Sequence, residues 1–560
     1  MSNRMNHAAI TKRSAIRLTT GLLGLLAGAC NSSPPQATPA PTLRPEKRRN
    51  VPAPPRPVAG TITIGIGSDA QTLQPLLARD TASAAYIATH YNAPLMRRNP
   101  ETLDWDPTYG TAAGVVIGDQ GRTLRFTLKP GLQWSDGKPL TVHDYRYTYA
   151  RMSDPSTGYP YRDLFRPFEA VTTPDDETLE LTLREPFCPA LDYAVLNPIP
   201  QHVFGDAPLD AHPASTKPTV GSGAWILSSW TRDQEAVFVA NDRFYLGRPP
   251  TDRLVFRLAR DADAALALLR TGEIDHAVLQ ASNWDEAART PGIRAVGYYP
   301  PTAAWTYIGF NLRRPLLSDI RIRRALAHAI DRTRMVTTIR QGHARLIDSI
   351  VASASWASTS DVTRSPYDLA KARQLLDEAG WRTPEGQQEG IRTRDGVPLI
   401  LRLHYNAGNR EREQIATMTS DFARAVGIQI DCVAEEWAPF LNRVNGTHDV
   451  DLYILGWSSP VEPHGTSPIW MTGGGQNASG YTNTQVDALF SQATAVNGCR
   501  QDERQRLYAE LQRKITADVP CIFLWENESL SAYADRLNVN PLTRLGYDYR
   551  PWEWRPRPAP

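Results

Sequence analysis

Alternating apolar and polar residues mark the first clear element of the chain. Leu124, Phe126 and Leu128 alternate with polar residues, which is the period of a strand buried on one face. Trp134 and the Ser-Asp-Gly that follows it form a turn sequence, because Gly accepts positive φ and Asp bonds its own backbone. Thr141, with Asp144 three residues later, has the spacing of a capping box at a helix start. Residues 124–149 therefore predict a strand, a tight turn and a helix.

The same patterns continue along the chain. Residues 399–404 and 428–431 are predicted strands, and residues 412–426 between them form a predicted helix. Such a unit implies a right-handed crossover and parallel pairing. Strands alternating with helices favour an α/β fold, and 560 residues are too many for one ordinary core. Other strands are expected at residues 61–66, 180–183, 307–312, 451–457 and 520–525, and other helices at residues 86–94, 264–269, 320–330, 367–379, 481–487 and 504–515.

The first 59 residues have the features of an export signal and a tether. Basic residues precede the short apolar segment 18–29, which is too short to span a bilayer as a resident helix of about 20 residues. The segment ends in Ala-Gly-Ala-Cys30, which resembles a lipoprotein box, although Ala27 stands where Leu is usual. We expect lipidation of Cys30; the alternative is cleavage nearby by the ordinary signal peptidase. Residues 31–59 are rich in Pro, Ala and charge, which predicts an extended, disordered tether.

Composition and motifs narrow the function. The chain is 41% hydrophobic and 21% charged, which is typical of globular proteins. Its net charge of +2 and scattered basic residues give no sign of a nucleic-acid partner. The nucleophile motif Gly-x-Ser-x-Gly and the zinc motif His-Glu-x-x-His do not occur. The Gly-rich residues 221–225 lack the Lys-Ser/Thr of a phosphate loop. The sequence therefore predicts no enzyme, no metal and no cofactor.

Four cysteines lie beyond Cys30. An exported protein can form disulfides, and four cysteines allow three full pairings between which the sequence cannot choose. The alternative is that they are free thiols. No pair of them has the spacing of a zinc site. They are Cys188, Cys432, Cys499 and Cys521.

At least six ordered motifs connect the chain to a known family, and four of them are the most specific. The run F-T-L-x-x-G-x-x-W-S-D-G-x-P-L-T-x-x-D begins at Phe126, and N-x-x-F-Y-x-G-x-P begins at Asn241. Residues 307–332 and 367–381 carry two more motifs, the second of which is Y-D-L-A-K-A-x3-L-x2-A-G-W. Together they resemble the peptide/nickel-type (family 5) substrate-binding proteins of bacterial ABC importers. The resemblance implies a class II periplasmic binding protein fold, with two lobes around a cleft and a small α+β domain inserted in the first lobe.

The resemblance also implies an organisation and a role. We expect a monomer in the periplasm, held to a membrane by lipidated Cys30, that closes over a peptide or peptide-like solute and delivers it to a permease driven by an ATPase. The expected parts are a signal peptide with a lipoprotein box (residues 1–30), a Pro-rich disordered tether (31–59), lobe I (60–92, 181–297 and 539–560), inserted domain II (93–180) and lobe III (298–538).

The loop after the predicted strand 451–457 bears on the ligand. In dipeptide- and oligopeptide-binding relatives, an Asp in this loop pairs with the α-amine of the peptide. Here Pro460 falls near its place and Glu462 is the only acid of the loop. Either Glu462 substitutes for the Asp, or the ligand has no α-amine, or Glu462 is simply an exposed loop acid. The missing Asp favours an alternative ligand class: an oligosaccharide, an opine-like compound or a metal chelate.

Aromatic residues are the other candidates for the binding site. Trp437 corresponds to a Trp that borders the cleft in the family, and Trp457 ends the strand before the loop. The alternative for each aromatic side chain is core packing. We also expect main-chain groups of Ser68 to Gln71 to pair with an extended ligand by strand addition. The full set of candidate ligand-binding residues is Ser68, Gln71, Tyr159, Tyr161, Trp437, Trp457, Ser458, Ser459 and Glu462.

Overall fold

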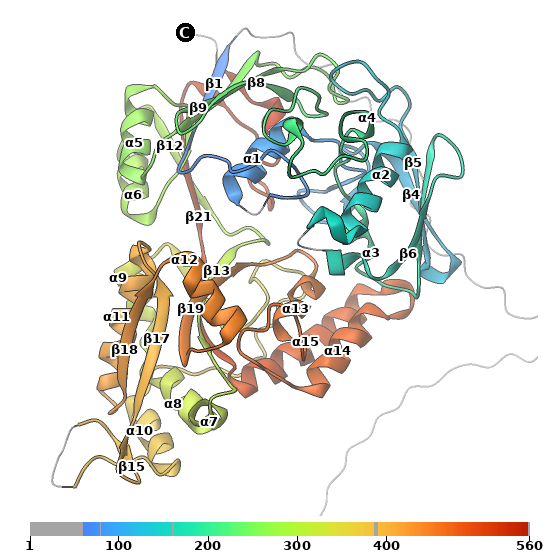
Figure 1. Ribbon diagram of the computed structural model, residues 1–560. Coiled ribbons are helices and arrows are strands. Elements are labelled where there is room, and N and C mark those ends of the chain that lie inside the picture. The colour runs from blue at the N-terminus through green and yellow to red at the C-terminus, as the bar shows by residue number, and fades with distance from the viewer. Residues whose placement is uncertain (1–59, 79, 160–161, 386–389, 558–560) are drawn as a thin grey trace, which may run out of the picture. The chain divides into compact units, whose positions relative to one another are not determined.

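The computed structural model describes residues 60–78, 80–159, 162–385 and 390–557, and these residues form three main sheets (Figure 1). Residues 1–59, with the expected signal, Cys30 and tether, lie outside this description. Within the described residues, no helix combines the length and apolar character that crossing a membrane requires.

Lobe I is the body built on a seven-stranded sheet with the order β12-β21-β11-β1-β10-β9-β8. Strand β1 pairs in parallel with both β10 and β11 in the middle of the sheet. The remaining pairs are antiparallel. Its elements are β1 (Thr61–Ile66), α1 (Thr81–His90), β8 (Trp225–Thr231), β9 (Glu235–Ala240), β10 (Arg253–Leu258), α5 (Ala262–Thr271), β11 (His276–Val278), α6 (Ala281–Arg289), β12 (Ile293–Tyr298) and β21 (Ser529–Ala534).

Domain II is the body built on the antiparallel sheet β4-β5-β7-β6. The predicted strand, turn and helix are confirmed here as β5 and α2, and Thr141 and Asp144 form the capping box. Trp134 is fully buried, and its Nε1–H donates to Asp144 Oδ2 over 3.3 Å, which fixes the bend against the helix start. The elements are β4 (Ala112–Gly118), β5 (Thr123–Leu128), α2 (Val142–Ser153), β6 (Phe168–Thr172), β7 (Thr178–Leu183), α3 (Ala190–Ala194) and α4 (Gln201–Phe204).

Lobe III is the body built on a six-stranded sheet with the order β14-β20-β13-β19-β17-β18. Strands β17 and β18 pair in parallel around α11, which confirms the predicted strand–helix–strand unit. The strands are β13 (Ala304–Phe310), β14 (Ala344–Leu346), β17 (Ile400–Asn406), β18 (Gln429–Glu435), β19 (Leu452–Ser458) and β20 (Cys521–Asn527). The helices are α7 (Pro315–Ser318), α8 (Ile320–Ala329), α9 (Arg332–Arg340), α10 (Leu369–Glu378), α11 (Arg410–Arg424), α12 (Trp437–Asn442), α13 (Ser467–Trp470), α14 (Thr484–Thr494) and α15 (Gln501–Asp518).

The strand pairing differs from two of the domain boundaries expected from the sequence. Leu181 lies inside β7, whose residues pair with β5 and β6 of domain II, so this strand does not begin the return to lobe I. Strand β21 pairs with β11 and β12 of lobe I, although its residues were expected in lobe III. Both strands satisfy their backbone hydrogen bonds in a sheet that their sequence alone does not identify.

The chain passes between lobes I and III at two adjacent places. Strand β12 ends at Tyr298 in the sheet of lobe I, and β13 begins at Ala304 in the sheet of lobe III. The return path runs from β20, which ends at Asn527, to β21, which begins at Ser529 (Figure 1). Short crossings of this kind permit one lobe to rotate against the other.

One disulfide is formed among the described cysteines. Cys188, which follows β7, is bonded to Cys499, which lies between α14 and α15 of lobe III. Cys432 is free and exposed, and Cys521 is free and buried. The outcome is thus one bond and two free thiols, rather than a full pairing of all four cysteines.

Candidate functional site

The carboxyl ends of three strands of lobe III meet at one edge of its sheet. Strand β17 is parallel to β18 and to β19, so Asn406, Glu435 and Ser458, their last residues, lie at the same edge. In open α/β sheets ligands bind outside this edge. This edge therefore carries the candidate site, and the crossing that begins β13 lies beside it, since Ala304 pairs with Ser458.

Two of the predicted aromatic residues lie at this edge. Trp437 is the first residue of α12 and is 49% exposed, so the alternative of core packing does not hold for it. Trp457 is partly buried, and its Nε1–H donates to the hydroxyl oxygen of Tyr307 over 3.1 Å. Burial raises the pKa of Tyr307, so its hydroxyl stays neutral. The hydrogen bond fixes the ring of Trp457, and both indoles offer apolar faces beside the edge of the sheet.

A guanidinium that the sequence analysis did not single out completes this surface. Arg412 belongs to the first turn of α11, directly after the loop that leaves β17. Its guanidinium carbon lies 5.6 Å from the ring centroid of Trp437, and its Nη1 donates to Asn406 Oδ1 over 2.7 Å. Burial lowers the pKa of Arg412, although the side chain stays partly accessible. The position after a parallel strand was the signal that could have identified it.

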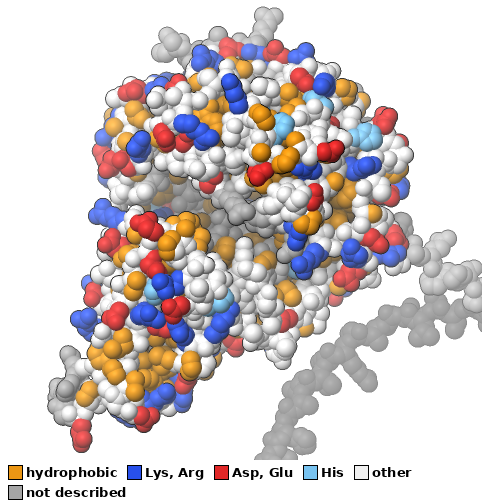
Figure 2. Space-filling model, viewed as in Figure 1, with side chains coloured by type: hydrophobic (Ala, Val, Ile, Leu, Met, Phe, Trp, Pro, Cys, Tyr) orange, Lys and Arg blue, Asp and Glu red, His pale blue; other side chains and the backbone are white. Residues whose placement is uncertain are grey.

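A cavity of about 510 Å³ lies between the two lobes beside this turn. Lobe I contributes residues 280–282, and lobe III contributes residues 338–341, 408–411 and Gln414. Arg340 and Glu411 on its wall form an ion pair, with 3.1 Å between Nη1 and Oε2. The volume falls within the range of about 300–1,000 Å³ that is typical of small-molecule sites. Figure 2 shows the surface hollowed between the two lobes.

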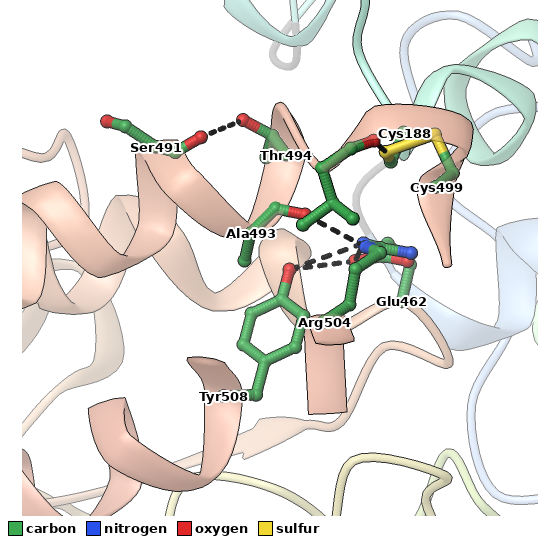
Figure 3. Close-up of a disulfide and its surroundings, with 9 residues drawn as sticks. Cys188, Glu462, Ser491, Ala493, Thr494, Cys499, Arg504 and Tyr508 are labelled. Carbon is green, nitrogen blue, oxygen red and sulfur yellow. Dashed lines mark hydrogen bonds and ion pairs between the residues drawn. A yellow bond between two sulfur atoms is a disulfide. The ribbon is translucent and has the colours of Figure 1, made fainter. Parts of the chain in front are cut away.

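Glu462 has a partner inside the protein. It is only 6% exposed, so the interpretation as an exposed loop acid is wrong. Its Oε1 accepts from Arg504 Nη2 over 2.6 Å and from the Tyr508 hydroxyl over 3.0 Å (Figure 3). The backbone N–H of His464 donates to the same oxygen over 3.2 Å. The carboxylate is thus neutralised by a buried cation of α15 rather than by a ligand amine.

The loop after β1 uses part of its main chain internally. Ser68 and Gln71 are exposed, but the N–H of Gln71 donates to Ser83 Oγ over 2.9 Å. The N–H of Ala70 donates to Asp69 Oδ1 over 2.9 Å, and its carbonyl accepts from Arg232. These three main-chain groups are used inside the protein, and the expected strand addition by residues 68–71 stays a prediction that rests on the other main-chain groups of the loop.

The remaining candidates fall into different environments. Ser458 is exposed at the edge of the sheet, and Ser459 is 4% exposed with its N–H donating to Ala303 O over 3.1 Å. Tyr159 packs in the core of domain II, with its ring 6.0 Å from that of Phe165, which is the alternative of core packing. Tyr161 lies outside the described residues. Among the described residues, no group of three or more His, Cys, Asp or Glu side chains is arranged to hold a metal ion.

Comparison with known proteins agrees with this architecture. The family model of bacterial extracellular solute-binding proteins, family 5, matches residues 106–479. The oligopeptide-binding protein AppA of Bacillus subtilis is 27% identical over 448 residues, which cover 77% of this chain and 79% of AppA. Protein XP55 of Streptomyces lividans is 29% identical over 500 residues, covering 85% of each chain.

Solved structures show the same fold. The structure of B. subtilis AppA in complex with a nonapeptide has a TM-score of 0.78 and 24% identity, and it covers 90% of this chain and 100% of AppA. The structure of NikA from Brucella suis in complex with Fe(III)-EDTA also has a TM-score of 0.78, with 19% identity and coverage of 89% and 100%. The α/β fold with two lobes around a cleft is therefore confirmed. This chain belongs to family 5 of the bacterial extracellular solute-binding proteins.

Proposed function

We propose that this protein captures a peptide or peptide-like solute between lobes I and III and delivers it to the membrane permease of its importer. As a family 5 protein it acts outside the cytoplasm as the substrate-binding component of an ABC import system. The relatives of this family are binding proteins, and the role proposed here involves no covalent change of the solute.

The observation that carries the proposal is the surface at the edge of the lobe III sheet. Trp437 is 49% exposed there, Trp457 is held by Tyr307, and the interlobe cavity of about 510 Å³ lies beside α11. The wall of this cavity is mostly polar, and a cavity of this size can enclose a solute and fill spare volume with water. The two crossings between the lobes allow the cavity to close by a hinge motion, which a ligand drives by binding the closed form more tightly.

A specific observation supports a second class of ligand. The loop after β19 has Pro460 near the place of the amine-binding Asp, and its only acid, Glu462, is paired with Arg504. This loop therefore offers a peptide amine no uncompensated carboxylate, and a buried amine without a partner costs several kcal/mol. A non-peptide solute, such as an oligosaccharide, an opine-like compound or a metal chelate, avoids this cost. NikA, which shares the fold, was solved with Fe(III)-EDTA.

Identification of a bound solute tests the proposal. The protein purified under mild conditions is denatured, and the released small molecules are analysed by mass spectrometry. Peptides should be recovered, and a synthetic copy of one should raise the unfolding midpoint; at 100 times its Kd the expected stabilisation is about 2.7 kcal/mol. Recovery of a non-peptide solute that stabilises the protein, with no effect of any recovered peptide, would establish the second class instead.

We further propose that the protein is a periplasmic monomer anchored to a membrane by lipid on Cys30. The sequence supports this proposal through the Ala-Gly-Ala-Cys30 box and the tether that follows it. Fractionation of cells that express the full chain should place the protein with the membranes, and Cys30→Ser should release it to the soluble fraction. Equal partitioning of both forms would contradict the anchor.

A further inference from the structure

The two halves of the protein have separate hydrophobic cores. Domain II packs onto lobe I, because Ile87 and Tyr245 pack against the cores of both. Two hydrogen bonds add to this contact: Ser135 N–H donates to Gly221 O over 2.9 Å, and Gly221 N–H donates to Ser135 Oγ over 3.0 Å. Among the described residues, the two core clusters of lobe III contain only residues 305–525. Domain II and lobe I therefore form one body, and lobe III forms the other.

The disulfide joins these two bodies at one end of the space between them. Cys188 follows β7 of domain II, and Cys499 lies between α14 and α15 of lobe III. Beside the bond, the N–H of Cys188 donates to Thr494 O over 2.8 Å, and the rings of Phe187 and His464 lie 5.3 Å apart. Figure 1 shows α3 and α14 at this end, whereas α6 and α9, beside the interlobe cavity, lie at the opposite end.

The bond limits how far the two bodies can separate at this end. Its two Cα atoms are 5.3 Å apart, and a disulfide keeps such atoms within about 7 Å of each other. The crossings between lobes I and III, residues 299–303 and Glu528, form the other connection. Two bodies that are joined at two separate places can turn only about the line through those places. The disulfide therefore prevents every rotation that would open the end at α14.

We infer that the bond between Cys188 and Cys499 makes the domain II end of the cleft a permanent wall. The lobes open by a single hinge rotation about the line through the bond and the crossings. A solute consequently enters and leaves the cleft away from the end at α14. This inference goes beyond the proposed function, because it concerns the motion of the lobes and the path of the solute, whichever class of solute binds.

Distances across this end test the inference in the ligand-free protein. The background is the full chain with Cys30→Ser and Cys432→Ser, which leaves the disulfide and the buried Cys521. Fluorophores are attached to unnatural amino acids that replace Glu185 of domain II and Gln492 of α14, which are both exposed. Co-purified solute is removed by unfolding in urea without reductant and refolding. Single-molecule energy transfer then gives the distribution of distances between the two fluorophores.

Three forms of this protein are compared. They are the disulfide form, the reduced form, and a reduced form in which a long, flexible bis-maleimide rejoins Cys188 and Cys499. The disulfide form should show one short and narrow distribution, and the other two forms should shift to longer distances with a broader distribution. The rejoined form keeps the chain closed between the two cysteines, so it retains the restriction of the unfolded state if the reduced form proves too unstable to fold.

Fluorophores at Glu413 and Gln492, which are both exposed in lobe III, are the matched control. Their distribution should be the same in the three forms, because lobe III is one body. Equal distributions of the Glu185–Gln492 pair in the disulfide and rejoined forms would overturn the inference, since the contacts beside the bond would then hold this end without it. The experiment uses no solute, so its failure is distinct from a failure of the proposed peptide specificity.

Discussion

The disulfide between Cys188 and Cys499 should contribute more to the free energy of unfolding than any single hydrogen bond or ion pair of the described residues. It joins domain II to lobe III across 311 residues of sequence. In the chain-entropy account, a loop of this length loses enough freedom in the unfolded state to stabilise the fold by about 6 kcal/mol, while native disulfides typically contribute 2–5 kcal/mol. The double variant Cys188→Ser/Cys499→Ser should therefore be less stable than the wild type by roughly 2–5 kcal/mol.

Urea unfolding followed by tryptophan fluorescence measures this difference, because the free energy of unfolding falls linearly with urea. Each protein is unfolded with and without a thiol reductant. The reductant should lower the midpoint of the wild type to that of the double variant and leave the double variant unchanged. Cys432→Ser is the control, since Cys432 is exposed and unbonded, and it should behave as the wild type does in both conditions.

Two results would refute this reasoning. Equal midpoints of the wild type and the double variant would show that the bond does not restrict the unfolded chain. A double variant that still responds to the reductant would show that Cys432 or Cys521 forms a bond in solution. Mass spectrometry after thiol labelling gives an independent check: the mature wild type should expose two more labelled cysteines among residues 60–557 after reduction than before.

Three further predictions concern the site and the buried charges. Glu462→Gln leaves Arg504 buried without its carboxylate, so it should destabilise the protein by about 3–5 kcal/mol in urea unfolding. Any loss of affinity should be equal for a peptide and its N-acetylated form. A larger loss for the peptide with the free amine would restore Glu462 as the amine anchor. Trp437→Ala should weaken solute binding by roughly tenfold and change stability by no more than roughly 0.5 kcal/mol, whereas Val397→Ala, also exposed at 60%, should change neither. Burial lowers the pKa of His90, His276 and His464 to about 4, so below the unfolded-state His pKa of about 6.5 the unfolded chain binds more protons than the folded one. The stabilisation should therefore be complete above a pH of about 6.5 and fall by up to about 3 kcal/mol per histidine as the pH drops to about 4. His90→Gln should flatten this pH dependence and the exposed His143→Gln should not; equal slopes for the two variants would contradict the role of burial.

The sequence predicted those features that depend on neighbouring residues. Strand β5, the turn at Trp134 and the capped start of α2 followed from local periodicity and turn chemistry, and the parallel pair β17 and β18 followed from the helix between them. Helix boundaries were less accurate: α1 begins at Thr81, five residues before the predicted start, because Asp80 caps it by accepting the N–H of Ser83.

Features that depend on distant residues were missed for a physical reason. The alternating apolar residues of β7 suit the sheet of lobe I and that of domain II equally well. Only its pairing with β5 and β6 shows that it belongs to domain II. The pairing of Cys188 with Cys499 and of Glu462 with Arg504 depends on tertiary contacts between residues 311 and 42 positions apart. Arg412 belongs to no motif, and its place beside Trp437 depends on how α11 and α12 pack.

These distant contacts determine how the loop after β19 presents the candidate site. At its start, Ser458 pairs with Ala304 of β13, and the N–H of Ser459 is bonded to Ala303 O over 3.1 Å. At its end, Glu462 is held by Arg504, close to the disulfide of Cys499 (Figure 3). A loop fixed at both ends loses little further entropy when a solute binds. The buried ion pair therefore serves binding indirectly: it fixes the end of the loop that follows Trp457, while Trp437 provides an exposed contact at the same sheet edge.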